Sequence, residues 1–129
     1  LVDVDYFKKY NDHYGHPAGD ACLQNIARAL ELHVRRTNDF CARIGGEEFA
    51  ILLPNTARDD AHRLGEALCQ RVAAAAWPHA MAPKGKVTLS IGLATWRTGM
   101  SPEDIYKCSD QALYHAKANG RDNCQAAAS

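Results

Sequence analysis

Acidic residues near the start of the chain could bind a divalent cation. The apolar run Leu1–Val4 is typical of a short β-strand, and two acids, Asp3 and Asp5, lie at its end. One carboxylate, together with the backbone carbonyl of Val4 between the two acids, would offer the oxygen-only ligands that Mg²⁺ prefers. The alternative is a strand end that turns into solvent, and this cluster taken alone favours that alternative.

Two glycines followed by two acids form a second candidate site. Gly45 and Gly46 would make a tight two-residue turn, where phosphates could approach the backbone without meeting a Cβ atom. Because phosphates are negative, a metal would have to lie between them and the carboxylates of Glu47 and Glu48. With Asp3 on a neighbouring strand, these acids could serve metal-dependent phosphoryl transfer. An ordinary hairpin with solvated acids is the alternative.

Two cations near the end of the chain could neutralise phosphate charge. Lys117 and Arg121 are four residues apart, so on a helix they would share one face. The C-terminal end of a helix favours cations in any case. Taken alone, this structural role is the better explanation.

The spacing of apolar residues predicts the elements that must position these side chains. Strands are expected over residues 1–4, 40–44, 48–53, 86–95 and 123–125. Helical turns are expected over residues 6–11, and longer helices over residues 18–36, 57–76 and 101–119, the last capped by Ser101 with Pro102 in its first turn. This order indicates an α+β fold, a mixed or antiparallel sheet with helices packed on one face.

Length and composition exclude several functional classes. The 129 residues fit one domain, so residues 1–129 are expected to form a single unit. Lys plus Arg and Asp plus Glu each number 15, so the chain lacks the basic surplus of a nucleic-acid polymer binder. No stretch is long enough for membrane insertion. The five dispersed cysteines indicate reduced thiols in a cytoplasmic protein.

Four ordered blocks of this sequence resemble the GGDEF domain of diguanylate cyclases. They are DVDYFKKYNDHYGHPAGD at residues 3–20, GGEEF at residues 45–49, TLSIG at residues 88–92 and ALYHAKANGR at residues 112–121. The resemblance runs from residue 1 to about residue 123. It implies a polymerase-palm-like, ferredoxin-like domain that condenses two GTP into cyclic di-GMP with release of two pyrophosphates.

The resemblance also implies a metal site. Asp3 and Glu47 would bind Mg²⁺ through their side chains and Val4 through its carbonyl, with Mn²⁺ as a possible substitute and two ions in each half-site. Glu48 would be a further ligand or would help to deprotonate the attacking 3′-hydroxyl.

Substrate contacts follow from the same resemblance. Asn11 and Asp20 would read the guanine edge, because a carboxylate accepts from guanine N–H groups. His16 belongs to this set, more as a brace of the loop than as a direct contact. The triphosphate would be bound by Lys8, Lys117, Arg121, the turn at Gly45 and Gly46, and backbone N–H groups near Phe7.

Each domain of this family holds one GTP, so catalysis implies a homodimer. Arg36 and Asp39 fit the family's R-x-x-D site for inhibition by the product; the alternative is a helix-terminal arginine beside a solvated acid. The family also carries a helix before its first strand, which this sequence lacks. We therefore expect an N-terminally truncated, weakly active piece of a longer protein that has an upstream sensory or dimerisation domain.

Two other functions stay open. The chain could be a catalytically silent module that binds GTP or cyclic di-GMP and signals through a partner. It could also be another palm-type cyclase that uses ATP or makes a cyclic mononucleotide. The intact acids Asp3, Glu47 and Glu48 argue against a silent module, and the guanine readers Asn11 and Asp20 argue against ATP.

Overall fold

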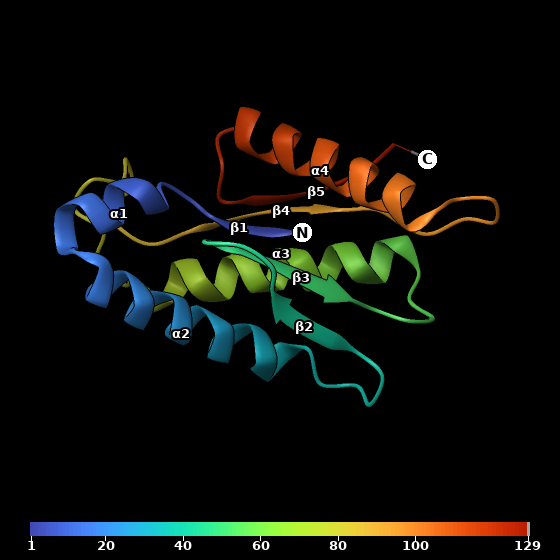
Figure 1. Ribbon diagram of the computed structural model, residues 1–129, viewed down its shortest axis with the longest axis horizontal. Helices are drawn as coiled ribbons and strands as arrows, with labels where there is room; N and C mark the ends of the chain where they lie inside the picture. Colours follow the sequence, from blue (N-terminus) through green and yellow to red (C-terminus); the bar gives the residue numbers. More distant parts are fainter. Residues whose placement is uncertain (129) are drawn as a thin grey trace.

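The computed structural model describes residues 1–128, which form a five-stranded mixed sheet with helices on both faces (Figure 1). The strand order is β2-β3-β1-β4-β5, and only the β4–β5 pair is parallel. The strands are β1 (Val2–Val4), β2 (Phe40–Arg43), β3 (Glu48–Leu52), β4 (Leu89–Leu93) and β5 (Asn123–Ala126). This α+β architecture confirms the predicted fold class. Residue 129, part of the predicted domain, lies outside the described residues.

Four helices connect these strands, close to where the sequence predicts them. They are α1 (Phe7–Tyr14), α2 (His16–His33), α3 (Arg58–Ala75) and α4 (Pro102–Ala118). The predicted cap of α4 is confirmed as a capping box, in which the Ser101 hydroxyl accepts from the Asp104 N–H and the Asp104 carboxylate accepts from the Ser101 N–H. The first helix is longer than expected and ends at Tyr14, followed by Gly15, which has a φ of 90°.

The expectation of helices on one face only is wrong. Successive residues of a strand point to opposite faces, so Ile91 and Gly92 of β4 show what covers each face. A Cβ atom on Gly65 of α3 would lie 3.7 Å from the Ile91 side chain, whereas a Cβ atom on Gly92 would lie 2.1 Å from the backbone N of Leu113 in α4. The backbone of α4 therefore rests directly on the sheet at Gly92, opposite α3.

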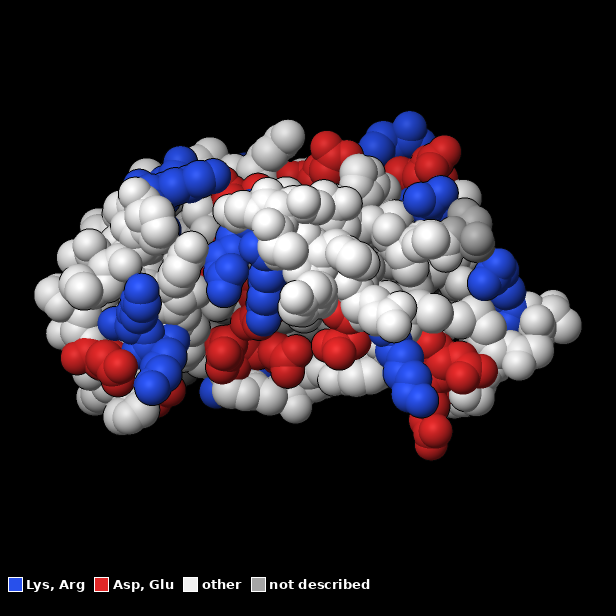
Figure 2. Space-filling model, turned by 90° about the horizontal axis from the view of Figure 1, so that it is seen from above, with Lys and Arg blue, Asp and Glu red and all other residues white. Residues whose placement is uncertain are grey.

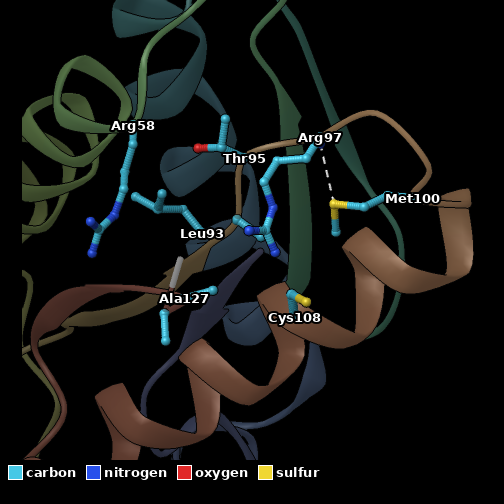
Figure 3. A pocket seen from close by; sticks show the side chains of 9 residues that line it. Arg58, Leu93, Thr95, Arg97, Met100, Cys108 and Ala127 are labelled. Carbon is cyan, nitrogen blue, oxygen red and sulfur yellow. Dashed lines mark hydrogen bonds between the residues drawn. The ribbon is translucent and has the colours of Figure 1, made fainter.

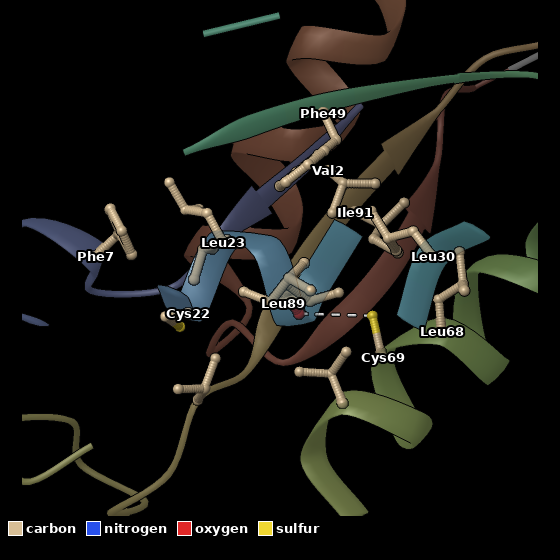
Figure 4. Packing of buried hydrophobic residues seen from close by; sticks show 14 of the residues in the cluster. Val2, Phe7, Cys22, Leu23, Leu30, Phe49, Leu68, Cys69, Leu89 and Ile91 are labelled. Atoms are coloured by element: carbon tan, nitrogen blue, oxygen red, sulfur yellow. Dashed lines mark hydrogen bonds between the residues drawn. The ribbon is translucent and has the colours of Figure 1, made fainter. Parts of the chain in front are cut away.

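The main hydrophobic core lies between the sheet and helices α2 and α3 (Figure 4). Strands β1, β3 and β4 contribute Val2, Val4, Phe49, Leu89 and Ile91, and the two helices contribute Leu23, Ile26, Leu30, Leu68 and Val72. Burial of each such side chain contributes about 1.5–3 kcal/mol to folding. The same strands turn their polar residues, Asp3 and Ser90 among them, toward the α4 face.

All five cysteines are free thiols. Burial raises the pKa of Cys22 and of Cys124 to about 11, so both stay protonated at neutral pH. No helix within residues 1–128 is both long and apolar enough to cross a membrane. Lys and Arg side chains mix with Asp and Glu over the face seen in Figure 2, with no broad basic patch.

A cavity of about 230 Å³ opens where β4 ends (Figure 3). Leu93, Arg97, Cys108 and Ala127 are among its lining residues. Leu93 is the last residue of β4, whereas Asp3 of β1 pairs with Ser90, the second residue of that strand, and with Glu48 of β3 on its other side. The cavity therefore lies at the end of β4 beyond those acids.

Candidate active site

Two of the predicted acids face each other across neighbouring strands, and a lysine lies over them. Asp3 of β1 pairs in register with Glu48 of β3, so their side chains lie on the same face of the sheet. That face is the one covered by α4, which supplies Lys117, and the Lys117 ammonium forms an ion pair with Asp3 Oδ2. The structure therefore brings together residues from three predicted clusters that are far apart in the sequence.

The oxygen atoms at this position suit a hard divalent cation. Asp3 is only 6% exposed, and its Oδ1 is buried without a hydrogen-bond partner. The Val4 N–H donates to the Glu47 carbonyl at 3.2 Å, so Glu47 lies beside the end of β1. Within residues 1–128 no three or more His, Cys, Asp or Glu side chains are arranged to hold a metal. An ion here would therefore also need backbone, water or substrate oxygens, as Mg²⁺ commonly does.

The hairpin between β2 and β3 is confirmed, but its turn is one residue longer than predicted. The Ile44 N–H donates to the Glu48 carbonyl at 2.9 Å, which leaves residues 45–47 between the paired ends. Neither Gly45 nor Gly46 has a positive φ, so this is not the two-residue turn that needs one. A Cβ atom on Gly46 would meet nothing within 4 Å. A ligand could therefore approach the backbone closely at Gly46.

Arg43 holds this turn in place, a role that the sequence analysis missed. Its Nε donates to the carbonyls of Gly45 at 3.0 Å and Gly46 at 2.9 Å. The sequence does carry a signal for this role. An arginine side chain lies two residues before a glycine turn, and it is long enough to reach the turn carbonyls, which have no partner in the sheet. Beside Arg43, a cavity of about 230 Å³ lies between α2 and the hairpin, lined by residues that include Leu23, Glu31 and Phe49.

Glu48 is the carboxylate of this site with a perturbed pKa. Partial burial raises the pKa of Glu48, and the negative charge of Asp3 raises it further, while Lys117 opposes both effects. The charges of Asp110 and Glu47 add smaller increases. A carboxylate with a raised pKa accepts a proton more readily near neutral pH. The arrangement can thus combine a metal-binding carboxylate, Asp3, with a basic one, Glu48.

Arg121 and Lys8 lie on the side of the site where α1 begins. The guanidinium carbon of Arg121 lies 4.7 Å from the centre of the Tyr6 ring, just before α1. Lys8 is exposed in the first turn of α1, directly after the buried Phe7. The N-terminus of a helix favours anions. The phosphate contacts expected of these cations stay a prediction.

The predicted guanine readers lie at the corner between α1 and α2. A Cβ atom on Gly19 would be 1.7 Å from Asn11 Oδ1, so only glycine allows the two helices to approach this closely. Asn11 Oδ1 is buried and has no hydrogen-bond partner, while the neighbouring Asp20 is exposed. His16 is exposed at the start of α2 and forms no hydrogen bond or ion pair within the described residues. Its expected bracing role stays a prediction.

The R-x-x-D residues lie at the other end of the hairpin. Arg36 donates to both carboxylate oxygens of Asp39, at 2.9 and 3.0 Å, and also contacts the Pro54 carbonyl and the Thr56 hydroxyl. The hydrogen bond from Arg36 lowers the pKa of Asp39. At about 3.3 Å per residue, β3 alone separates Glu48 from Leu52 by about 13 Å, and Pro54 lies two residues beyond the end of that strand. This pair is a separate site from the acids.

The effect of Asp3 and Lys117 on the pKa of Glu48 gives a direct test of the arrangement of these three residues. Lys117→Met removes a cation from beside Glu48 and should raise its pKa further, whereas Asp3→Asn removes a negative neighbour and should lower it. Carboxyl ¹³C NMR titration of Glu48 measures both. Deprotonating Glu48 costs folding free energy as pH rises through its raised pKa, so Asp3→Asn should also reduce that loss of stability.

Lys107→Met, at an exposed lysine of the same helix, is the matched control and should leave the Glu48 pKa unchanged. If Lys117→Met and Asp3→Asn moved that pKa in the same direction, the described proximity would be wrong.

Comparison with known proteins identifies the family. The family described as "Diguanylate cyclase, GGDEF domain" matches residues 1–123. Over 128 residues the chain is 41% identical to the diguanylate cyclase DgcP of Pseudomonas aeruginosa, covering 98% of this chain and 19% of that protein. The chain thus spans about a fifth of this curated relative's length.

Comparison with solved structures indicates the same family. The active GGEEF domain of a diguanylate cyclase from Vibrio cholerae has a TM-score of 0.85 at 37% identity, covering 99% of this chain and 80% of that one. The coiled coil and GGDEF domain of DgcB from Caulobacter crescentus, in complex with c-di-GMP, has a TM-score of 0.89 at 30% identity, covering 98% of this chain and 66% of that one. This chain therefore belongs to the GGDEF domain family.

Proposed function

We propose that this chain is a diguanylate cyclase domain, which joins two GTP molecules into cyclic di-GMP and releases two pyrophosphates. The main observation behind this proposal is that Asp3, Glu48 and Lys117 lie together at one end of the sheet. One buried carboxylate oxygen of Asp3 has no hydrogen-bond partner there. Family membership supplies the reaction. Phosphoryl transfer needs positioning and charge neutralisation, both of which this constellation can supply.

The metal residues are Asp3 and Glu47 through their side chains and Val4 through its carbonyl. Two Mg²⁺ ions, or Mn²⁺ in their place, would neutralise the phosphate charge and acidify the attacking hydroxyl. Glu48 takes the proton of the 3′-hydroxyl as the new P–O bond forms at the α-phosphate and the bond to pyrophosphate breaks. Its place opposite Asp3, beside the proposed metal ligands, supports this role.

The nucleotide would lie across the start of α1. Asn11 and Asp20 bind the guanine edge, and the unpartnered oxygen of Asn11 supports this assignment. The phosphates are bound by Lys8, Lys117, Arg121, the backbone near Phe7 and the turn at Gly45 and Gly46, while His16 braces the loop.

Catalysis needs two copies of the domain. One site holds one GTP, so each 3′-hydroxyl must meet the α-phosphate held by a second copy, as a C2 dimer allows. An upstream domain of a longer protein would bring the copies together; the solved structure of DgcB, which holds a coiled coil as well as the GGDEF domain, supports this arrangement. We also propose a cytoplasmic location, no membrane insertion by this segment and no nucleic-acid polymer as partner; the intermixed charges on the face seen in Figure 2 support the last of these.

Product inhibition would act through Arg36 and Asp39. Arginine can grip a phosphate and stack on guanine, while the carboxylate accepts from guanine N–H groups. Their distance from the acids supports a regulatory site rather than a second catalytic one. Because the two side chains now bind each other, the product would have to share or replace these hydrogen bonds.

The activity itself gives the first test. Incubated with GTP and Mg²⁺, the purified chain should form cyclic di-GMP, at a rate per chain that rises with protein concentration. Glu47→Gln removes a metal ligand and should lower the rate about 100-fold or more. Chromatography against nucleotide standards measures the product.

Glu103→Gln, an exposed glutamate of α4, is the control and should keep full activity. GTP bound without turnover, even when the chain is fused to a dimerising segment, would instead support a silent binding module.

The regulatory site gives the second test. Arg36→Ala should leave the initial rate unchanged and raise the cyclic di-GMP concentration for half-inhibition about tenfold or more, because it removes charge-assisted hydrogen bonds to the product. Rates measured against added product give this value. Arg28→Ala, at another exposed arginine, should not change it. Inhibition that persists unchanged in Arg36→Ala would refute this assignment.

A further inference from the structure

Arg121 is held by an aromatic ring instead of a carboxylate. Its guanidinium lies over the Tyr6 ring, and its one hydrogen bond, to the Lys117 carbonyl, is long at 3.5 Å. No carboxylate lies within ion-pair distance of it in residues 1–128, whereas Lys117 is paired with Asp3. Stacking on a ring face leaves the N–H groups at the edge of a guanidinium free. Arg121 is therefore restrained and still open to an anion.

The backbone of Tyr6 has an unusual conformation that a buried histidine supports. Tyr6 has φ 55° and ψ 33°, a left-handed geometry that residues other than glycine seldom adopt. Its carbonyl lies 3.0 Å from Nε2 of His79, which is 1% exposed. Because a carbonyl only accepts, Nε2 must carry the proton and donate it. The hydrogen bond from His79 therefore holds the Tyr6 backbone in this conformation.

The loop that carries His79 is itself fixed against α1. The His79 ring lies edge-on to Tyr10, with ring centres 5.1 Å apart, and the Ala80 N–H donates to the Tyr14 hydroxyl at 2.9 Å. Neither contact involves an expected substrate-binding residue. The loop is thus packed along α1 as far as Tyr14, the last residue of that helix.

The same loop also fixes the turn that carries Arg121. Arg121 and Asp122 both have positive φ, at 61° and 49°. The Asp122 carboxylate pairs with Lys84 at 2.8 Å, and its N–H donates to Asp5 Oδ2 at 3.0 Å. The loop therefore contacts Tyr6 through His79 and the residue that follows Arg121 through Lys84.

We propose that Tyr6 and His79 are positioning residues for the triphosphate of the substrate. The Tyr6 ring holds the Arg121 guanidinium with its donors open to phosphate, and His79 holds Tyr6 in the conformation that presents the ring. The inference rests on the proposed function, in which Arg121 binds the phosphates of GTP.

A double-mutant cycle tests this with 3′-deoxy-GTP, which lacks the attacking hydroxyl and is not turned over. Arg121→Ala and Tyr6→Leu should each weaken its binding about five- to tenfold, and the double variant should bind no more weakly than Arg121→Ala alone. Tyr6→Phe keeps the ring and should stay within about twofold of the wild type. Calorimetry gives the dissociation constants.

Matched variants separate positioning from folding. His79→Leu should weaken 3′-deoxy-GTP binding, and His79→Gln, which keeps an N–H donor, should restore part of it. Tyr106→Leu, at an exposed tyrosine of α4, should change nothing. All variants should bind 3′-deoxyguanosine, which has no phosphates, as the wild type does. Melting temperatures verify folding, and Tyr6→Met replaces Tyr6→Leu if that variant does not fold.

Two results would overturn the inference in distinguishable ways. If Tyr6→Leu weakens binding as much in the Arg121→Ala background, or weakens nucleoside binding too, Tyr6 acts through the fold, while the proposed function stands. If Arg121→Ala binds 3′-deoxy-GTP like the wild type, the phosphate role of Arg121 fails, and the inference fails with that part of the proposed function.

Discussion

The buried carboxylate of Asp5 is the constraint on which this end of the molecule depends. It is 3% exposed and accepts three hydrogen bonds, from the Thr88 hydroxyl at 2.7 Å, the Ser90 hydroxyl at 2.6 Å and the Asp122 N–H at 3.0 Å. A buried charge without such partners would cost several kcal/mol. The end of β1, the strand β4 and the turn after α4 are therefore fixed in one mutual arrangement.

Because of this constraint, Asp3 in β1 and Asp5 just after it have different roles. Asp5 has its oxygens satisfied by protein donors and serves the fold, whereas Asp3 keeps one buried oxygen unpartnered and is available to a cation. Tyr6, which directly follows Asp5, leads into α1, and Arg121, which is expected to bind the phosphates, directly precedes Asp122, a partner of Asp5. A fold requirement thus sets the geometry of the site.

Much of the fold follows from local sequence signals, and the rest depends on packing between distant residues. Apolar spacing predicts the elements, and Ser101 followed by Pro102 predicts the cap of α4, because these features are determined within a few residues. The sequence analysis did not predict that helices cover both faces of the sheet. This arrangement depends on Gly92, whose lack of a side chain lets the α4 backbone pack directly on the sheet. The motif residues predict which acids would form the metal site. The roles of Arg43, Asp5 and His79 were missed, because their partners depend on the turn conformation or lie far along the chain.

The most direct test of the central claim, that this end of the sheet binds a metal–GTP complex, is paramagnetic broadening by Mn²⁺ in ¹⁵N NMR spectra with 3′-deoxy-GTP bound. Broadening should be strongest at the amides of Asp3, Val4, Glu47 and Glu48 and weakest near Arg36 and Asp39. Broadening centred elsewhere, such as at the cavity beside Leu93 and Cys108, would contradict the account.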